Sequence, residues 1–213
     1  MNADISDVIY SFSETEFNLL ASAAGIKELM CFSSDGGVKL PDRAGYDRLL
    51  FGLSKRGVIE ERDGVIAMAE PYAGIFRCIR DRKFTVHYLG RDEETILYRN
   101  GENLVRAVPG RGDNEYIRLS LLDASQLSVI LEELLPETLI PADLSMHRAV
   151  VTETGGAEER LATLSVFSAG DTIAMKAGLI MRGPYMYMSE EAGETAYDKK
   201  VLTERIAGLT EGI

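Results

Sequence analysis

The chain has 213 residues, 46% of them hydrophobic and 27% charged, and its formal net charge is −11. This composition is typical of a globular protein that buries a core in one domain or two small ones. The acidic balance argues against a protein that grips duplex DNA, because phosphates are neutralised by clustered Lys and Arg side chains. No apolar run approaches the roughly 20 residues that span a bilayer, and Met1 to Asp4 lacks the basic start of a signal peptide. We therefore expect a cytoplasmic protein without a membrane partner.

The first predicted helix begins at Ser13. Ser13 and Glu16 have the spacing of a capping box, and Phe12 and Phe17 have the spacing of a hydrophobic staple. Gly25 follows the last apolar position, where a helix commonly ends. The apolar stripe has helical spacing and consists of Phe17, Leu20, Ala21 and Ala24.

A second helix is predicted over residues 41–56, and a small hairpin follows around Asp63-Gly64. Two helices and a hairpin in this order resemble a winged helix. A DNA-binding version would be basic on the second helix and at the hairpin tip, whereas here both signs alternate. The charged residues of the helix and the tip are Asp42, Arg43, Asp47, Arg48, Lys55, Arg56, Glu60, Glu61, Arg62 and Asp63. We therefore expect the scaffold to serve packing or protein contact, and nucleic acid is not the favoured partner.

The middle of the chain predicts a short helix over residues 72–80 and then a tight β-meander. Asn100-Gly101 should form its type I′ turn, which requires positive φ at both central residues. The strands are expected over residues 83–89, 94–99, 104–108 and 116–121.

The meander leads into a second capped helix. Asp123 stands at its N-cap, Gln126 occupies the capping-box position, and Pro136 stops it. The same order of cap and apolar stripe appears at Ser13, so the chain uses one helix-start pattern twice. The stripe of the second helix consists of Leu127, Ile130, Leu131 and Leu134.

Methionine and tyrosine are concentrated in the C-terminal third. Strands are expected over residues 161–167 and 185–188, a strand or mixed segment over 172–182, and a closing helix that ends near Gly212. Alternating Tyr and Met suits a strand with one buried and one exposed face, which is the interpretation we favour. Such side chains can also repack around varied partners. The candidate partner-binding residues are Met181, Tyr185, Met186, Tyr187 and Met188.

The sequence carries no catalytic, metal-binding or nucleotide-binding signature. Cys31 and Cys78 lack metal-ligand spacing and are expected to be small buried thiols. His87 and His147 lack neighbours at ligand spacing, so a structural role is expected. No nucleophile, base and orienting group can be assembled. We therefore predict a protein that is not an enzyme and that has no cofactor and no metal site.

Several short motifs in residues 13–136 occur in a recognisable order. They are Phe17-x-x-Leu20 ending at Gly25, Leu53-x-x-x-Gly57-Val58-Ile59, Leu97-Tyr98-Arg99-Asn100-Gly101, Val105-Arg106-Ala107-Val108 and Leu134-Leu135-Pro136. This order resembles the EspG-type chaperones of type VII (ESX) secretion. The resemblance implies an α+β (mixed α/β) fold with a central, mostly antiparallel sheet flanked by helices and two quasi-equivalent halves. It also implies a cytosolic, non-enzymatic chaperone. The tight turn at Asn100-Gly101 departs from the long partner-binding loop that the family can carry, so no binding residue is transferred.

Two parts are predicted. Residues 1–82 form a helical, winged-helix-like part, and residues 83–213 form a sheet-forming part with the meander and the remaining helices. The alternative is that both belong to one continuous domain. The predicted function is a cytosolic protein-binding chaperone or adaptor for a helical partner, which by resemblance is a type VII secretion substrate. The alternative is a winged-helix transcriptional regulator with a C-terminal ligand-binding or dimerisation module. The sequence leaves open whether the chain is also a homodimer.

Overall fold

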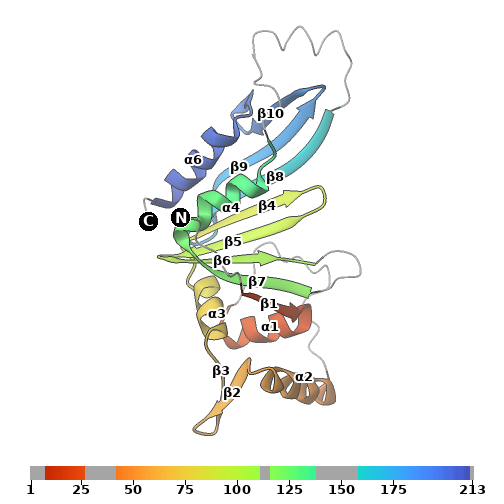
Figure 1. Cartoon of the computed structure of the whole chain (residues 1–213), viewed down its shortest axis with the longest axis vertical. Helices are drawn as coiled ribbons and strands as arrows, with labels where there is room; N and C mark the ends of the chain where they lie inside the picture. The colour runs from red at the N-terminus through yellow and green to blue at the C-terminus, as the bar shows by residue number, and fades with distance from the viewer. Residues whose placement is uncertain (1–7, 27–41, 111–115, 138–157, 212–213) are drawn as a thin grey trace. The chain divides into compact units, whose positions relative to one another are not determined.

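The computed structural model describes residues 8–26, 42–110, 116–137 and 158–211 (Figure 1). The predicted α+β class is confirmed: the described residues form five α-helices, a large antiparallel sheet and a separate two-stranded hairpin. The strands of the large sheet are hydrogen-bonded in the order β1-β7-β6-β5-β4-β8-β9-β10-β11, and the hairpin consists of β2 and β3. In the described segments, no helix combines the length and the apolar composition that crossing a bilayer requires.

The chain divides into two compact units. Unit 1 comprises residues 1–82 and 98–122, and unit 2 comprises residues 83–97 and 123–213. Strand β5 (Glu94–Asn100) contributes residues to both. The sequence-based division into residues 1–82 and 83–213 stays a prediction.

Unit 1 contains three helices, the hairpin and strands of the large sheet. Its core includes the rings of Phe12, Phe17 and Phe76, which are at most 1% exposed. The Phe76 ring lies 6.2 Å from that of Phe12 and 5.5 Å from that of Phe17, distances at which aromatic pairs attract. Besides the end of β5 and most of β7 (Tyr116–Asp123), the elements are β1 (Ile9–Ser13), α1 (Glu14–Ala23), α2 (Arg43–Lys55), β2 (Ile59–Arg62), β3 (Val65–Met68), α3 (Tyr72–Arg80) and β6 (Asn103–Val108).

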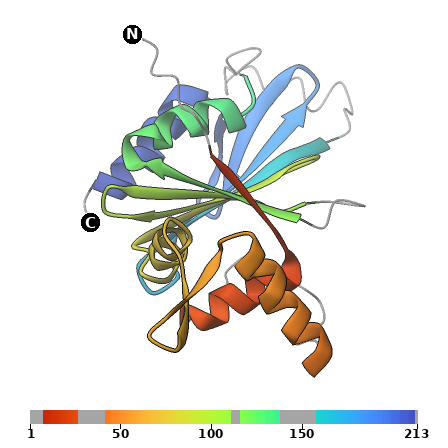
Figure 2. The same ribbon diagram turned by 60° about the horizontal axis from the view of Figure 1, so that its bottom comes forward.

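Unit 2 contains the C-terminal strands and two helices. Figure 2 shows α4 and α6 side by side on one face of the strands of this unit. The Tyr197 hydroxyl donates a hydrogen bond to the Pro136 carbonyl oxygen at 2.8 Å, which links the end of α4 to the start of α6. The elements are β4 (Phe84–Gly90), the start of β5, the 3-10 turn η1 (Ala124–Gln126), α4 (Leu127–Leu134), β8 (Glu158–Ser168), β9 (Thr172–Arg182), β10 (Tyr185–Glu190), β11 (Gly193–Ala196) and α6 (Lys199–Glu211).

The meander turn differs from the prediction. Asn100 is the last residue of β5, and the loop is Gly101-Glu102. Of Asn100 and Gly101, only Gly101 has a positive φ, 59°, which is the pattern of a type II′ turn. The type I′ prediction is therefore wrong here, because Asn100 extends the strand and moves the loop one residue along. In the β2–β3 hairpin, by contrast, Asp63 and Gly64 both have positive φ, 53° and 76°.

The two predicted helix starts have different outcomes. At Ser13 the capping box is confirmed: Ser13 N donates to Glu16 Oε2 at 2.9 Å, and Glu16 N donates to Ser13 Oγ at 3.3 Å. At Asp123 the carboxylate accepts instead from Ser125 N at 2.8 Å, and the 3-10 turn η1 precedes α4. Gln126 belongs to that turn and makes no capping hydrogen bond with its side chain, so this part of the prediction is wrong.

Candidate functional site: an apolar groove in unit 1

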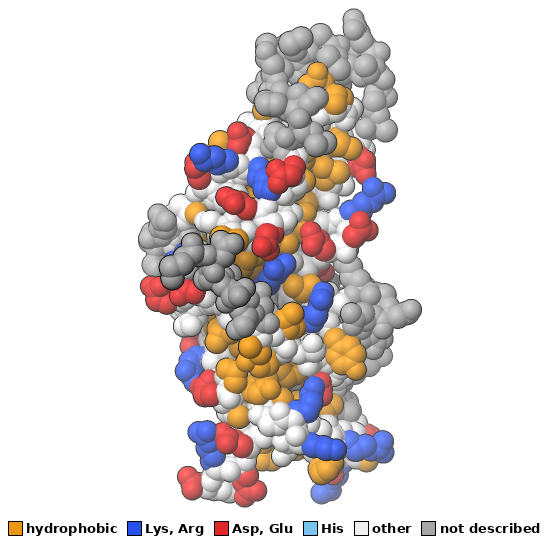
Figure 3. Space-filling view, in the orientation of Figure 1, with side chains coloured by type: hydrophobic (Ala, Val, Ile, Leu, Met, Phe, Trp, Pro, Cys, Tyr) orange, Lys and Arg blue, Asp and Glu red, His pale blue; other side chains and the backbone are white. Residues whose placement is uncertain are grey.

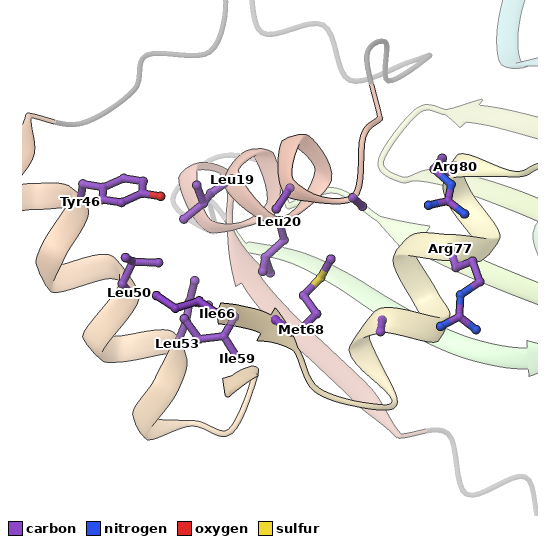
Figure 4. Close-up of a pocket in the computed structure, with 14 residues that line it drawn as sticks. Leu19, Leu20, Tyr46, Leu50, Leu53, Ile59, Ile66, Met68, Arg77 and Arg80 are labelled. Carbon is purple, nitrogen blue, oxygen red and sulfur yellow. The ribbon is translucent and has the colours of Figure 1, made fainter. Parts of the chain in front are cut away.

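Unit 1 has an apolar groove with a cavity volume of about 450 Å³, lined by α1, α2, the β2–β3 hairpin and α3 (Figure 4). We call it the unit-1 groove. Leu20, Leu53 and Ile59 are at most 7% exposed and form its buried part. Tyr46 and Ile66 line it as well but are 39% and 58% exposed. Apolar surface therefore continues from the interior of the groove to its rim.

The lining follows from the pattern of each element. Helix α1 contributes Leu19 and Leu20 and then, one turn later, Ala23 and Ala24, whose small side chains leave space. Helix α2 contributes positions i, i+4 and i+7, which fall on one face of a helix. In Figure 4 these α2 side chains face the two leucines of α1 across the groove; they are Tyr46, Leu50 and Leu53.

The two helical walls are connected at Glu16. Glu16 caps α1 with one carboxylate oxygen, and its other oxygen, Oε1, lies 2.5 Å from Arg56 Nη2. Arg56 is the C-cap residue of α2 and also donates to the Ser11 carbonyl oxygen at 3.4 Å. One partly buried carboxylate thus fixes both the start of α1 and the end of α2.

The hairpin wall depends on its turn. Asp63 and Gly64 occupy the left-handed region that a type I′ turn needs. Successive side chains of a strand point to opposite faces, and of the neighbours Val65 and Ile66 only Ile66 lines the groove. Val65 is 65% exposed and does not line the groove, so it is a matched control for Ile66, which does.

Helix α3 supplies the charged side chains of the groove. Arg77 and Arg80 line it, and both are exposed. Arg77 Nη2 donates to Glu70 Oε1 at 3.1 Å, and the Arg80 guanidinium pairs with both Asp81 oxygens at 2.7 Å. The pair with Asp81 raises the pKa of Arg80. Each of these two arginines is therefore paired with a neighbouring carboxylate of its own segment.

Exposed apolar side chains concentrate in the same unit. Of the twelve large hydrophobic residues that are exposed in the described segments, eight belong to unit 1. Phe51 of α2 is the most exposed of them, at 72%. Figure 3 shows hydrophobic side chains gathered over α1 and α3, whereas the hairpin region of this face is mainly charged or polar. A grouped apolar surface is typical of an interaction site, whereas scattered single residues are not.

The predicted partner-binding residues lie in unit 2. Met186 and Tyr187 are 2% and 0% exposed, so their side chains belong to the core of this unit. Met181, Tyr185 and Met188 are partly exposed, and Met181 lies opposite Met186 in the β9–β10 ladder. The predicted strand with one buried and one exposed face is wrong here, because the neighbours Met186 and Tyr187 point to opposite faces and are both buried. A contact surface here stays a prediction, and burial restricts it to Met181, Tyr185 and Met188.

Arg182 lies beside these residues and joins three strands. Its guanidinium donates to Glu158 of β8 at 2.9 Å and to Glu194 of β11 at 2.6 Å. It also lies over the Tyr187 ring, 5.6 Å from the centroid. The two carboxylates raise the pKa of Arg182, so the charge persists at any physiological pH. The cluster therefore stabilises the end of the sheet of this unit.

The cysteine and histidine that the structure describes, Cys78 and His87, form no reactive arrangement with the other described residues. Cys78 is buried and free, and burial raises the pKa of its thiol to about 11. His87 Nε2 lies 2.9 Å from Glu94 Oε1. No group of three residues that could hold a metal ion occurs in the described segments. Cys31 and His147 lie outside them.

The sequence already contained the signals of the unit-1 groove. The second helix and the hairpin were predicted as a scaffold that serves packing or protein contact. What the patterns did not reveal is that these faces leave space between them. The small side chains of Ala23, Ala24, Ala67 and Ala73 leave room in the groove, but an alanine alone does not indicate a cavity, because the packing of its neighbours decides whether the space is filled.

The fold and the groove together define an α+β protein with an open apolar groove in unit 1. Compared with known proteins, the chain matches no family model, and no curated protein is significantly similar to it in sequence.

Proposed function

We propose that this chain is a protein-binding chaperone or adaptor that holds a helical partner in the unit-1 groove. The observation that carries the proposal is the continuity of the apolar surface, from buried Leu53 to Ile66, which is 58% exposed. Helix-in-groove recognition uses apolar anchors in such a groove, and a few anchors supply most of the affinity. The net charge of −11 keeps such a complex soluble.

The proposal includes the finer features of the fold. The order α1, α2 and β2–β3 hairpin supports a winged-helix-like N-terminal part whose groove is used for protein contact. The strand-to-capped-helix connections at Ser13 and Asp123 support two quasi-equivalent halves. Both features fit the EspG-type chaperone of type VII secretion that the sequence resembles. The partner would then be a helical secretion substrate.

Site-specific photo-cross-linking tests the proposal. A photoreactive phenylalanine analogue replaces Ile66 in one tagged variant and Val65 in the matched control, and each is expressed in the native host. The side chain at position 66 should cross-link a helical protein, and the one at 65 should not. The captured protein is then identified, co-expressed and purified with the untagged chain as a stoichiometric complex. Equal cross-linking at both positions, or a chain that purifies alone, would contradict the proposal.

The winged-helix regulator is the second candidate, because α2 and the hairpin follow one another along the chain in the order of a recognition helix and a wing. Its charges argue against it: Arg56 pairs with Glu16 of its own unit, and Asp42 caps α2. Duplex binding depends strongly on salt when it rests on phosphate contacts. A mobility shift at low salt that disappears at high salt would favour the regulator over the chaperone.

A further inference from the structure

The shape of the unit-1 groove favours a helix over a small enclosed ligand. A small apolar ligand would fill the interior beside Leu20 and Leu53 but would leave the rim uncovered. Tyr46 and Ile66 stand on that rim, from α2 and from the hairpin, and both are exposed. An amphipathic helix laid along the groove would cover them, because its apolar residues at i, i+3, i+4 and i+7 form a continuous stripe.

The charge of the groove has one sign. Of the fourteen residues that line it, only Arg77 and Arg80 are charged (Figure 4). They are three positions apart on α3 and therefore lie on one face of the helix. A partner helix in the groove meets two guanidinium groups there, each already paired with a carboxylate that does not line the groove, although the chain as a whole is acidic.

The existing partners of these arginines do not prevent a further contact. The Arg77–Glu70 pair is exposed on both sides, 58% and 61%, and the side chains of Arg80 and Asp81 are 45% and 43% exposed. Exposed ion pairs contribute little to stability and exchange readily. A guanidinium has five N–H donors, and the contact with Glu70 uses one nitrogen of Arg77. Donors therefore remain for a carboxylate of a bound helix.

We infer that the unit-1 groove is specific for an acidic amphipathic helix, with an apolar stripe in the groove and Asp or Glu side chains that pair with Arg77 and Arg80. This inference rests on the proposed function and adds the chemistry of the partner. Charge-assisted hydrogen bonds from two guanidinium groups select acidic over basic helices, because charge complementarity sets specificity.

The test uses three synthetic helical peptides with the same leucine stripe. Residues that flank the stripe are Glu in the first, Gln in the second and Lys in the third, and each peptide carries a fluorophore for anisotropy. At low salt the Glu peptide should bind the full-length protein about tenfold more tightly than the Gln peptide, and the Lys peptide should bind most weakly. The preference should shrink as salt screens the exposed charges.

Two double variants separate the groove from the rest of the surface. Arg77→Gln with Arg80→Gln should bring the Glu and Gln peptides to within about twofold of each other. Arg43→Gln with Arg48→Gln removes two exposed cations of α2 that do not line the groove, and it should leave the tenfold preference unchanged. Far-UV circular dichroism and the unfolding midpoint of each variant establish that it is folded.

The outcomes distinguish this inference from the proposed function. If all three peptides bind equally and Ile66→Ser weakens each of them while Val65→Ser does not, the groove holds a helix but the charge inference is overturned. If the Glu preference persists in the Arg77/Arg80 variant, it is overturned as well. If no peptide binds, or if Ile66→Ser has no effect, both the inference and a helix-binding groove fail.

Discussion

Glu16 offers the sharpest test of how the walls of the unit-1 groove are held. We predict that Glu16→Ala lowers the free energy of unfolding by about 2 kcal/mol, because two interactions of its carboxylate are lost at once. Glu16 Oε2 accepts from Ser13 N, and Oε1 pairs with Arg56. Its side chain is 16% exposed, so water replaces these contacts incompletely.

The predicted loss of stability in Glu16→Ala is the combined effect of the contacts that the carboxylate makes. Loss of the capping hydrogen bond from Ser13 N, whose acceptor is a charged carboxylate, costs roughly 1–1.5 kcal/mol. The pair with Arg56 is discounted to less than about 1 kcal/mol, because the arginine side chain is 43% exposed. These effects overlap in one carboxylate and are not fully additive. For a chain of this length, the change corresponds to a decrease of about 4–8 °C in melting temperature.

Glu14 provides the control for this prediction. It is an exposed acid in the same first turn, so Glu14→Ala removes a similar interaction with the helix dipole, about 0.5 kcal/mol. Glu16→Gln should be intermediate, because Gln can still accept from the N-cap N–H but cannot form the ion pair. Urea unfolding followed by circular dichroism measures all three variants. Equal midpoints for Glu16→Ala and Glu14→Ala would refute the argument.

The helical peptides with the leucine stripe should also bind Glu16→Ala more weakly than the unaltered protein, since α1 frays in this variant.

Three further predictions concern stability. Arg182→Gln should lower the free energy of unfolding by about 2 kcal/mol, because the guanidinium links three strands. Arg205→Gln is the control: Arg205 has one partner and is 45% exposed, so its loss should cost less than about 1 kcal/mol. Equal losses of stability for the two variants in urea unfolding would contradict this. The pKa of the Cys78 thiol is about 11 in the folded protein and near 9 in the unfolded chain, so the unfolded chain loses this proton first. The free energy of unfolding should therefore fall by up to about 2 kcal/mol as pH rises between these values. Cys78→Ala should remove this contribution to the pH dependence, as measured by urea unfolding at each pH. Gly64→Ala should destabilise the protein by about 1 kcal/mol, because φ at this residue is 76°. Gly52→Ala should stabilise it by about 0.5–1 kcal/mol, because Gly52 lies inside α2 with open space around it. Thermal unfolding of both variants measures the sign of each change.

Local sequence patterns predicted most of the helices and strands. The capping box at Ser13 is a short-range arrangement of four residues, so the sequence specified it completely. The stop at Pro136 and the apolar stripe of α4 are local in the same sense. Strands β1 and β11 were not anticipated, since β1 is defined by its pairing with β7, more than a hundred residues away in the chain.

Local patterns were less informative about details that depend on neighbours. The loop at Gly101-Glu102 is set by how far the β5–β6 ladder extends, which the dipeptide Asn100-Gly101 does not encode. Likewise, the Met and Tyr alternation of β10 indicated two faces but not their exposure. Packing in unit 2 and the position of Arg182 over Tyr187 decided that Tyr187 is buried.

The sequence by itself determined the α+β class, the capped start of α1 and the apolar stripes of α1 and α4, because these follow from periods and caps within a few residues. Only the tertiary structure decided where apolar surface is left uncovered. The unit-1 groove draws its lining from four elements between Leu19 and Arg80, and its volume is the space that their packing does not fill. Space of this kind depends on how side chains distant in the sequence meet, and no local pattern specifies that.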